Sequence, residues 1–392
     1  MKSSHVLAWT IAASLALAAT LPAGAADPVK IGFVTTLSGP GGYTGEDIRD
    51  GFQLAIDEEG GKLGGVPVQV IVADDHLQPA AGKAAVDKLL EQDKVKLITG
   101  MVFSNVMVAT VPTIMDAGAF YISPNAGPAP FAGKGCNKNL FVASFQNDAA
   151  SEPAGLYSNQ RGYKKMIVLA PNYQAGKDMI NGFKSAYKGQ IADEIYVNLN
   201  QTDFSAEIAR IRDEKPDALF YFLPGGLGIA FLKQWAAAGL QKEIPIVVTV
   251  FSADGRIVSA VGDSALGVTL TGHWNSDFPN AANKKFVAGF ESTFHRLPTF
   301  YAAEGYDTAK LIASGLRSVG GDLTKADAFR AELEKAQFAS VRGAFKFGKN
   351  HFPIEDWYSM RVVAGPDGKP TIRTLGKVVS QLSDPFVAQC KM

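Results

Sequence analysis

Cysteine is scarce in this 392-residue sequence, which contains only Cys136 and Cys390. At most one disulfide can form, and it would tie the C-terminus back to a loop. The alternative is two unpaired, inert thiols. If the protein is exported, the disulfide is favoured, because a lone exposed thiol is a liability in an oxidising compartment.

An excess of charge of either sign is also lacking. Lys+Arg and Asp+Glu both total 38, so the composition does not suggest a polyanionic partner. The chain has no basic run and no base-stacking motif, which disfavours nucleic acid as a ligand.

Motifs of enzymes and nucleotide sites are absent or incomplete. There is no GxSxG elbow and no HExxH motif. Gly39 and Gly41 begin a GxG, but Thr44 stands where the third glycine is required, and every Gly-Lys pair lacks the Ser or Thr of a phosphate loop. After the first 26 residues, four histidines are scattered without the spacing of metal ligands: His76, His273, His295 and His351. We therefore expect no enzyme, no metal site and no bound cofactor.

Residues 1–26 are predicted to be a cleaved export signal. Lys2 supplies a positive start, residues 6–21 are apolar, and Ala23-Gly24-Ala25 offers a small-residue cleavage pattern. The apolar run is marginal for a membrane span and has no stop-transfer flank. No cysteine follows it, so a lipid anchor is not expected. The mature protein is predicted to be soluble and periplasmic.

The stretch 29–59 carries the first structural signal. Residues 29–35 are apolar and β-branched and predict a buried strand, which a glycine-rich loop follows. Thr44 is predicted to cap the next helix. The core stripe of that helix has helical spacing and consists of Ile48, Phe52, Ala55 and Ile56. Such a unit belongs to a parallel sheet, whose ligands bind beyond the carboxyl ends of the strands.

Strand and helix patterns alternate four times up to residue 127, which predicts an α/β domain. The pattern restarts at residues 165–169 and continues to 268–271, which predicts a second α/β domain of similar size. Helices over 283–293 and 302–318 follow, and then a strand-rich tail. No Pro- or Ser-rich linker separates the two halves, so we expect the chain to cross between them more than once.

Four segments resemble a known family: VKIGFVTTLSGPGGYTGE…GFQLAIDE, LITGMVFSNV, FYISPNAG and YAAEGYDTAKLI. They are similar to the type I periplasmic binding proteins, and more narrowly to the branched-chain amino acid (LIV) binding proteins of ABC importers. The resemblance covers essentially the whole mature chain, with its elements in order.

The resemblance implies an α/β fold with two Rossmann-like lobes, joined by three crossover strands around a central cleft. The N-terminal lobe would comprise residues 27–145 with 277–349, and the C-terminal lobe 146–276 with 350–392. The crossings would fall near residues 143–148, 272–276 and 349–354.

The resemblance also places a ligand carboxylate on the first lobe. Ser104 corresponds to a hydroxyl at the start of a helix, and Asn125 and Gly127, which flank Ala126, correspond to residues that supply backbone groups. Independently of the family, helix N-terminal amides and a hydroxyl can hold an anion without an arginine. The alternative role for Ser104 is a helix cap, and one serine can serve both purposes.

Aromatic side chains are expected to form the remaining walls. Tyr43, Tyr173 and Tyr306 correspond to ring contacts of the family, although core packing explains Tyr306 equally well. Phe103 and Trp274 follow predicted strands and are expected to add apolar surface.

Two positions depart from the amino-acid binders. Pro224 and Gly225 lie in a Leu-Pro-Gly-Gly loop that replaces a Gly-Gly-Tyr-like loop, so an aromatic hydroxyl is lost and an apolar rim gained. Asp254 stands where the family commonly has the Glu that meets a ligand ammonium. It could bind an amine, or it could only cap a helix. An aromatic carboxylate therefore remains an alternative to an amino acid.

The implied function is the substrate-binding component of an ABC importer, a monomer that delivers a small carboxylate to a permease and ATPase complex in the inner membrane. The alternatives are a ligand-sensing module for a receptor or kinase, and an amide or urea binder of the same fold.

Overall fold

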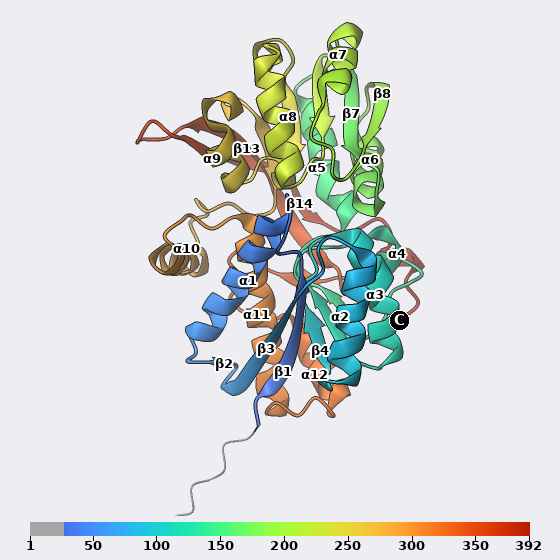
Figure 1. Cartoon of the computed structure of the whole chain (residues 1–392), viewed down its shortest axis with the longest axis vertical. Helices are drawn as coiled ribbons and strands as arrows, with labels where there is room; N and C mark the ends of the chain where they lie inside the picture. Colours follow the sequence, from blue (N-terminus) through green and yellow to red (C-terminus); the bar gives the residue numbers. More distant parts are fainter. Residues whose placement is uncertain (1–26) are drawn as a thin grey trace, which may run out of the picture.

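Two β-sheets organise the chain, and each lies at the centre of one lobe (Figure 1). The computed structural model describes residues 27–392, so the predicted export signal lies outside the described residues. The α/β fold class and the two-lobed architecture predicted from the sequence are confirmed.

The first sheet has the strand order β2-β3-β1-β4-β5-β6. Its strands are β1 (Val29–Thr35), β2 (Lys62–Leu63), β3 (Val66–Asp74), β4 (Leu97–Thr99), β5 (Phe120–Ser123) and β6 (Leu140–Val142). Apart from the short β2, which is antiparallel to β3, all neighbours pair in parallel. The carboxyl ends of β1, β4 and β5 therefore meet at one edge of the sheet.

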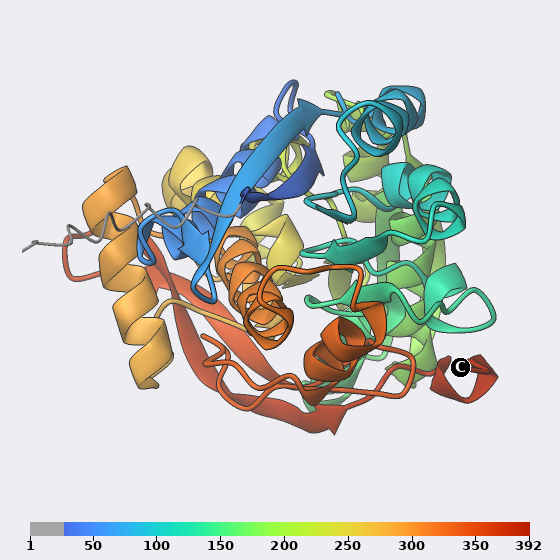
Figure 2. The ribbon, with the colours of Figure 1, turned by 90° about the horizontal axis from the view of Figure 1, so that it is seen from below.

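Helices from two distant parts of the sequence complete this lobe (Figure 1). They are α1 (Gly42–Asp57), α2 (Pro79–Glu91), α3 (Ser104–Asp116), α4 (Ala129–Ala132), α10 (Ala281–Phe294), α11 (Phe300–Val319) and α12 (Ala326–Lys335). Figure 2 shows α11 in orange beside the blue α1. Glycines allow this close approach, because a Cβ on Gly51 would lie 1.9 Å from the Ala302 carbonyl oxygen and one on Gly305 2.1 Å from that of Ile48.

The start of α1 differs from the sequence prediction. The helix begins at Gly42 with Gly41 as its N-cap, and no side chain caps it. Thr44 lies inside the first turn, where its hydroxyl donates back to the Gly41 carbonyl at 2.6 Å. The prediction that Thr44 caps the helix was therefore wrong, because the glycine-rich loop supplies the turn from its own backbone.

The second sheet has the order β12-β13-β11-β10-β9-β7-β8, and β14 pairs with β13. Its strands are β7 (Lys165–Pro171), β8 (Gln190–Val197), β9 (Ala218–Tyr221), β10 (Ile246–Thr249), β11 (Thr269–Gly272), β12 (Lys346–Phe347), β13 (Pro353–Ala364) and β14 (Pro370–Leu382). The helices of this lobe are α5 (Asn147–Gln160), α6 (Gln174–Ala186), α7 (Ser205–Glu214), α8 (Gly226–Ala237) and α9 (Gly255–Val261). Strands β7 to β11 pair in parallel, and β13 and β14 add an antiparallel edge.

The chain passes between the lobes three times: between β6 and α5, between β11 and α10, and between α12 and β13. We call these three connections the hinge. The buried guanidinium of Arg342 joins two of them, because it donates to the carbonyls of Ala143 and Ser144 and lies 3.0 Å from the Glu355 carboxylate.

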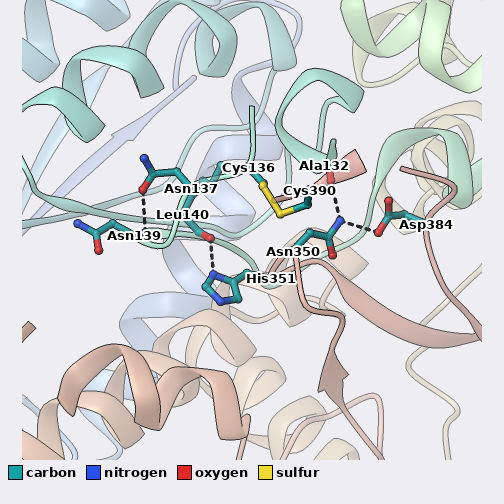
Figure 3. Close-up of a disulfide and its surroundings, with 9 residues drawn as sticks. All are labelled: Ala132, Cys136, Asn137, Asn139, Leu140, Asn350, His351, Asp384 and Cys390. Carbon is teal, nitrogen blue, oxygen red and sulfur yellow. Dashed lines mark hydrogen bonds between the residues drawn. A yellow bond between two sulfur atoms is a disulfide. The ribbon is translucent and has the colours of Figure 1, made fainter. Parts of the chain in front are cut away.

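The end of the chain returns to the first lobe beside α4 (Figures 1 and 2). Cys390 forms a disulfide with Cys136, the pairing that the sequence favours. Close to it, the Asn350 amide donates to the Ala132 carbonyl at 2.8 Å and to the Asp384 carboxylate at 2.9 Å (Figure 3). The last residues, assigned to the second lobe from the sequence, are thus attached to the first.

Candidate functional site

A cavity lies between the lobes, where the strands of both sheets end. About 320 Å³ of space there is not occupied by protein atoms, a figure that includes open solvent. Residues after β4 and β5 line it from the first lobe, and residues after β7, β9 and β10 from the second. Its walls are Val102, Phe103, Ser104, Asn125, Ala126, Phe145, Asn147, Tyr173, Ala175, Met179, Phe222, Pro224, Phe251 and Tyr301.

Aromatic rings from both lobes and from the hinge form most of the apolar wall. Phe145 lies 4.5 Å from Phe251, centroid to centroid, and Phe222 lies 6.1 Å from Phe251. Tyr173 lies 6.4 Å from both Phe103 and Phe222. These spacings are typical of interacting aromatic pairs, and a planar ring bound among them could make the same stacked and edge contacts.

The polar end of the cavity is the start of α3. Ser104 is the first residue of this 13-residue helix, and this buried residue lines the cavity. The first N–H groups of a helix lack intrahelical acceptors, and the dipole favours negative charge at this end. The site therefore offers an anion neutral donors rather than a cationic side chain.

The loop after β5 lies next to Ser104. The Asn125 amide nitrogen donates to the Val102 carbonyl at 2.6 Å, while its buried oxygen has no hydrogen-bond partner within residues 27–392. Gly127 approaches the hinge so closely that a Cβ would lie 1.9 Å from the Phe145 carbonyl oxygen. Its N–H donates to the Asn147 side-chain oxygen at 3.3 Å, so this group is engaged within the protein. The structure thus brings Asn125 and Ala126 to the cavity wall and places Gly127 behind it.

Asn147 and Asp178 form the polar support behind Ser104. The Asn147 amide nitrogen donates to the Ser104 hydroxyl oxygen at 3.2 Å and to the Asp178 carboxylate at 2.9 Å. Burial raises the pKa of Asp178, whereas hydrogen bonds from Asn147, the Ala129 N–H and Gln174 act in the opposite direction. The carboxylate is therefore anchored by three donors.

Tyr43, Gly225 and Asp254 lie outside the cavity wall, and Tyr43 and Asp254 join the lobes directly. The Tyr43 hydroxyl donates to the Asp254 carboxylate at 2.6 Å, across 211 residues of sequence. Asp254 also caps α9 by accepting from the N–H groups of Arg256 and Ile257. Burial raises the pKa of Asp254 to about 7, although the Tyr43 hydrogen bond lowers it.

Two further contacts complete this side of the interface. Arg256 pairs with Glu46 at 2.7 Å and with Asp47 at 2.8 Å. The Gly226 N–H, next to Gly225, donates to the Pro40 carbonyl at 3.0 Å. We call the Tyr43–Asp254 and Arg256–Asp47 contacts the latch. In this arrangement the carboxylate of Asp254 is occupied by Tyr43 and the helix start rather than directed at the cavity.

Trp274 and Tyr306 also lie away from the cavity. The Trp274 indole donates to Asn283 at 2.7 Å, and Trp274 lines a separate groove between the lobes. The Tyr306 hydroxyl donates to Glu58 at 2.7 Å, and its ring packs 4.8 Å from that of Phe286. Both side chains thus act within the protein.

Several lining residues were not identified from the sequence: Val102, Phe145, Asn147, Ala175, Met179, Phe222, Phe251 and Tyr301. Phe222 and Phe251 directly follow β9 and β10, so their strand-end positions were an available signal. Phe145 and Asn147 lie in a segment assigned only to a crossing. Tyr301 is in the first turn of α11, which begins two residues before the predicted start.

The cavity wall carries no acidic or basic side chain among the residues that the structure describes. Within residues 27–392, no cluster of His, Cys, Asp and Glu side chains could coordinate a metal ion. None of the helices in this part of the chain combines the length and the apolar character needed to cross a bilayer.

Comparison with known proteins gives consistent results. A family model described as periplasmic binding protein matches residues 28–369. Leu/Ile/Val-binding protein homolog 6 of Brucella melitensis is 27% identical over 369 residues, which cover 92% of this chain and 93% of the relative.

Two solved structures are similar over nearly their whole length. An ABC transporter solute-binding protein from R. palustris, in complex with benzoate, has a TM-score of 0.89 and 31% identity and covers 93% of this chain and 100% of its own. A second, from Rhodopseudomonas palustris BisB5 with 3,4-dihydroxybenzoic acid, has a TM-score of 0.84 and 29% identity, covering 91% and 99%. The names of these relatives describe binding proteins rather than enzymes.

Proposed function

Because the chain belongs to the periplasmic binding protein family, we propose that it captures a small aromatic carboxylate outside the cytoplasm and delivers it to the permease of an ABC importer. The family is extracytoplasmic, which agrees with a periplasmic location. We expect the protein to act as a monomer and to need no cofactor.

The character of the cavity wall carries this proposal. A branched-chain amino acid would bring an ammonium group as well as a carboxylate, and a buried ammonium needs an anionic or multiply accepting partner. The wall has rings on its apolar side, neutral donors at Ser104 and α3, a single unpaired amide oxygen at Asn125, and no carboxylate. An aromatic acid has one anionic group and one ring, which are the two features that this wall complements.

Two solved relatives point in the same direction, because they hold benzoate and 3,4-dihydroxybenzoic acid. Both are more similar to this chain than the solved isoleucine complex of a branched-chain amino acid binding protein, which is 24% identical.

Ligand capture by closure follows from the division of the wall. The donors lie on the first lobe, and the rings of Tyr173, Phe222 and Phe251 lie on the second. Neither half-site is complete alone, so a ligand stabilises the arrangement in which both contact it. The latch then holds the lobes together at the cavity's rim.

Isothermal titration calorimetry tests the proposal on the mature protein. Benzoate and 4-hydroxybenzoate should bind at least tenfold more tightly than leucine or isoleucine, since an unpaired ammonium would be buried. Tighter binding of either amino acid would overturn the aromatic assignment. Benzamide serves as the uncharged control, and equal affinity for benzoate and benzamide would contradict the carboxylate site.

A further inference from the structure

The amide of Asn147 has only one orientation that satisfies its three partners. Its oxygen accepts from the Gly127 N–H, a group that can only donate. Its nitrogen donates to Asp178, whose carboxylate receives three donors and therefore acts as an acceptor. A flipped amide would direct its NH₂ at a donor and its oxygen at a carboxylate.

This orientation determines the role of the Ser104 hydroxyl. The Asn147 amide nitrogen also lies 3.2 Å from the Ser104 oxygen and directs its second N–H there, so the serine oxygen accepts. A hydroxyl that accepts one hydrogen bond still has its own proton to donate. No side chain or carbonyl within residues 27–392 receives that proton, and Ser104 lines the cavity.

We propose that Asn147 is a positioning residue that fixes Ser104 as a hydrogen-bond donor toward the ligand, so that the cavity selects a carboxylate over its amide. The inference rests on the proposed function. A carboxylate offers only acceptors, whereas the NH₂ of an amide cannot accept the hydrogen bond from Ser104 and could be received only by the unpaired Asn125 oxygen. Asn147 begins α5 and Asp178 lies on α6. Residues of the second lobe therefore determine that the Ser104 hydroxyl on the first lobe acts as a donor toward the ligand.

The selection is thus linked to closure. The Ser104 hydroxyl is fixed as a donor toward the ligand only while Asn147 and Asp178 lie against α3 and the loop after β5. A carboxylate that requires this donor favours the closed arrangement, because a ligand shifts an equilibrium by its differential affinity for the two states.

A double-mutant cycle with benzoate and benzamide as probes tests this role. In wild-type background, Asn147→Ala should lower the preference for benzoate about twofold to tenfold, the usual range for one hydrogen bond. In a Ser104→Ala background, the same substitution should leave the preference unchanged, because Asn147 acts through the hydroxyl. A purely structural role would weaken both ligands alike and would not depend on Ser104.

Asn159→Ala is the matched control. Asn159 lies on the same helix, and its amide bonds to the Ala186 carbonyl and the Lys188 N–H, so the preference for benzoate should not change. If Asn147→Ala does not fold, Asn147→Asp keeps the side-chain size and presents an acceptor to Ser104, which should reduce the preference at least as much.

The outcomes separate the two claims. An unchanged preference in Asn147→Ala, or an equal fall with and without Ser104, overturns the role of Asn147 while the proposed function stands. Wild-type protein that binds neither probe overturns the proposed function and this inference with it.

Discussion

The cavity and the hinge are both buried between the lobes, yet they accommodate polar groups in opposite ways. The cavity wall is neutral, with rings on one side and hydroxyl and amide donors on the other. The hinge contains ion pairs: Arg342, which is 5% exposed, lies 3.0 Å from both Asp307 and Glu355. The same guanidinium also donates to the carbonyls of Ala143 and Ser144.

Two more ionisable groups join this hinge cluster. His273 and Glu304 are almost completely buried, 3.1 Å apart. Burial lowers the pKa of His273, with Arg342 acting in the same direction, and raises the pKa of Glu304. Both changes favour the neutral forms. Although burial acts against it, the neighbouring carboxylates raise the pKa of Arg342. The guanidinium therefore keeps its charge, while His273 and Glu304 favour their neutral forms.

The difference follows from what each region must accommodate. The hinge has no ligand to admit, so its charges can be paired permanently within the protein. The cavity must leave its donors unpaired until an anion arrives, and a charged wall would either repel that anion or bind any counterion. Ligand selection thus depends on the neutral residues of the cavity wall, whereas the attachment of the lobes depends on the charged residues of the hinge.

Among the substitutions considered, one in the hinge cluster should cause the largest loss of stability. Arg342→Met leaves Asp307 buried without its cationic partner, and we expect a loss of about 3–5 kcal/mol in the free energy of unfolding. Urea denaturation measures it. Arg210→Met is the control, since Arg210 pairs with Asp193 at the surface and should cost no more than about 1 kcal/mol. Equal losses in the two variants would contradict the role assigned to the hinge cluster.

Asp254 is intermediate between the two regions, since its carboxyl group is buried and ionisable but is hydrogen-bonded only to Tyr43 and to the start of α9. Its folded-state pKa of about 7 lies above the usual value of 3.8 for an aspartate, so the protonated form favours folding. This contribution is fully present below pH 3.8 and is lost as the pH rises through about 7.

Asp254→Asn should remove that contribution. Wild-type protein should lose stability relative to the variant between pH 4 and 7, on the order of a few kcal/mol. The asparagine oxygen can still accept at the start of α9, so the cap is retained. Chemical denaturation at a series of pH values gives the difference, and parallel curves for the two proteins would show that Asp254 does not titrate in this range.

On the cavity side, Ser104→Ala should weaken binding without a comparable loss of stability. A hydrogen bond to a charged group contributes about 1.5–3 kcal/mol, so benzoate affinity should fall roughly ten- to a hundredfold. Calorimetry and thermal unfolding of the same samples separate the two effects. Ser185→Ala on α6 is the control, since its hydroxyl bonds to the Gly182 carbonyl within its own helix. Full affinity in Ser104→Ala would place the carboxylate elsewhere.

The sequence predicted the elements better than the contacts between lobes. Residues 29–35 form β1 as predicted, because an apolar β-branched run between turn residues has few alternatives. Strand ends also indicated the region of Ser104, Asn125 and Tyr173. The pairing of Tyr43 with Asp254 spans 211 residues and depends on the angle between the lobes, which no local pattern encodes.

Helix phase separates Tyr306, which the family resemblance suggested, from Tyr301, which lines the cavity. Both tyrosines occur in α11, but only its first turn reaches the cavity. Five residues further on, the helix has advanced about 7.5 Å and turned by about 140°, which directs Tyr306 at Glu58 instead. Tyr301 lay outside the helix predicted from residue 302, and helix boundaries are the least certain part of a prediction from sequence.

Substitutions at these two tyrosines test whether residues that bind the ligand can be distinguished from residues that only pack the core. Tyr301→Leu removes a ring from the cavity wall and should weaken benzoate by about 0.5–1.5 kcal/mol, the usual size of one aromatic contact. Tyr306→Leu, the same substitution on the same helix, breaks the hydrogen bond to Glu58 and should lower stability while leaving the affinity within about twofold. Calorimetric titration with benzoate and thermal unfolding measure both quantities in both variants. If Tyr306→Leu weakened benzoate as much as Tyr301→Leu did, the ligand would extend beyond this cavity, and ring contacts would not distinguish its wall from the surrounding core.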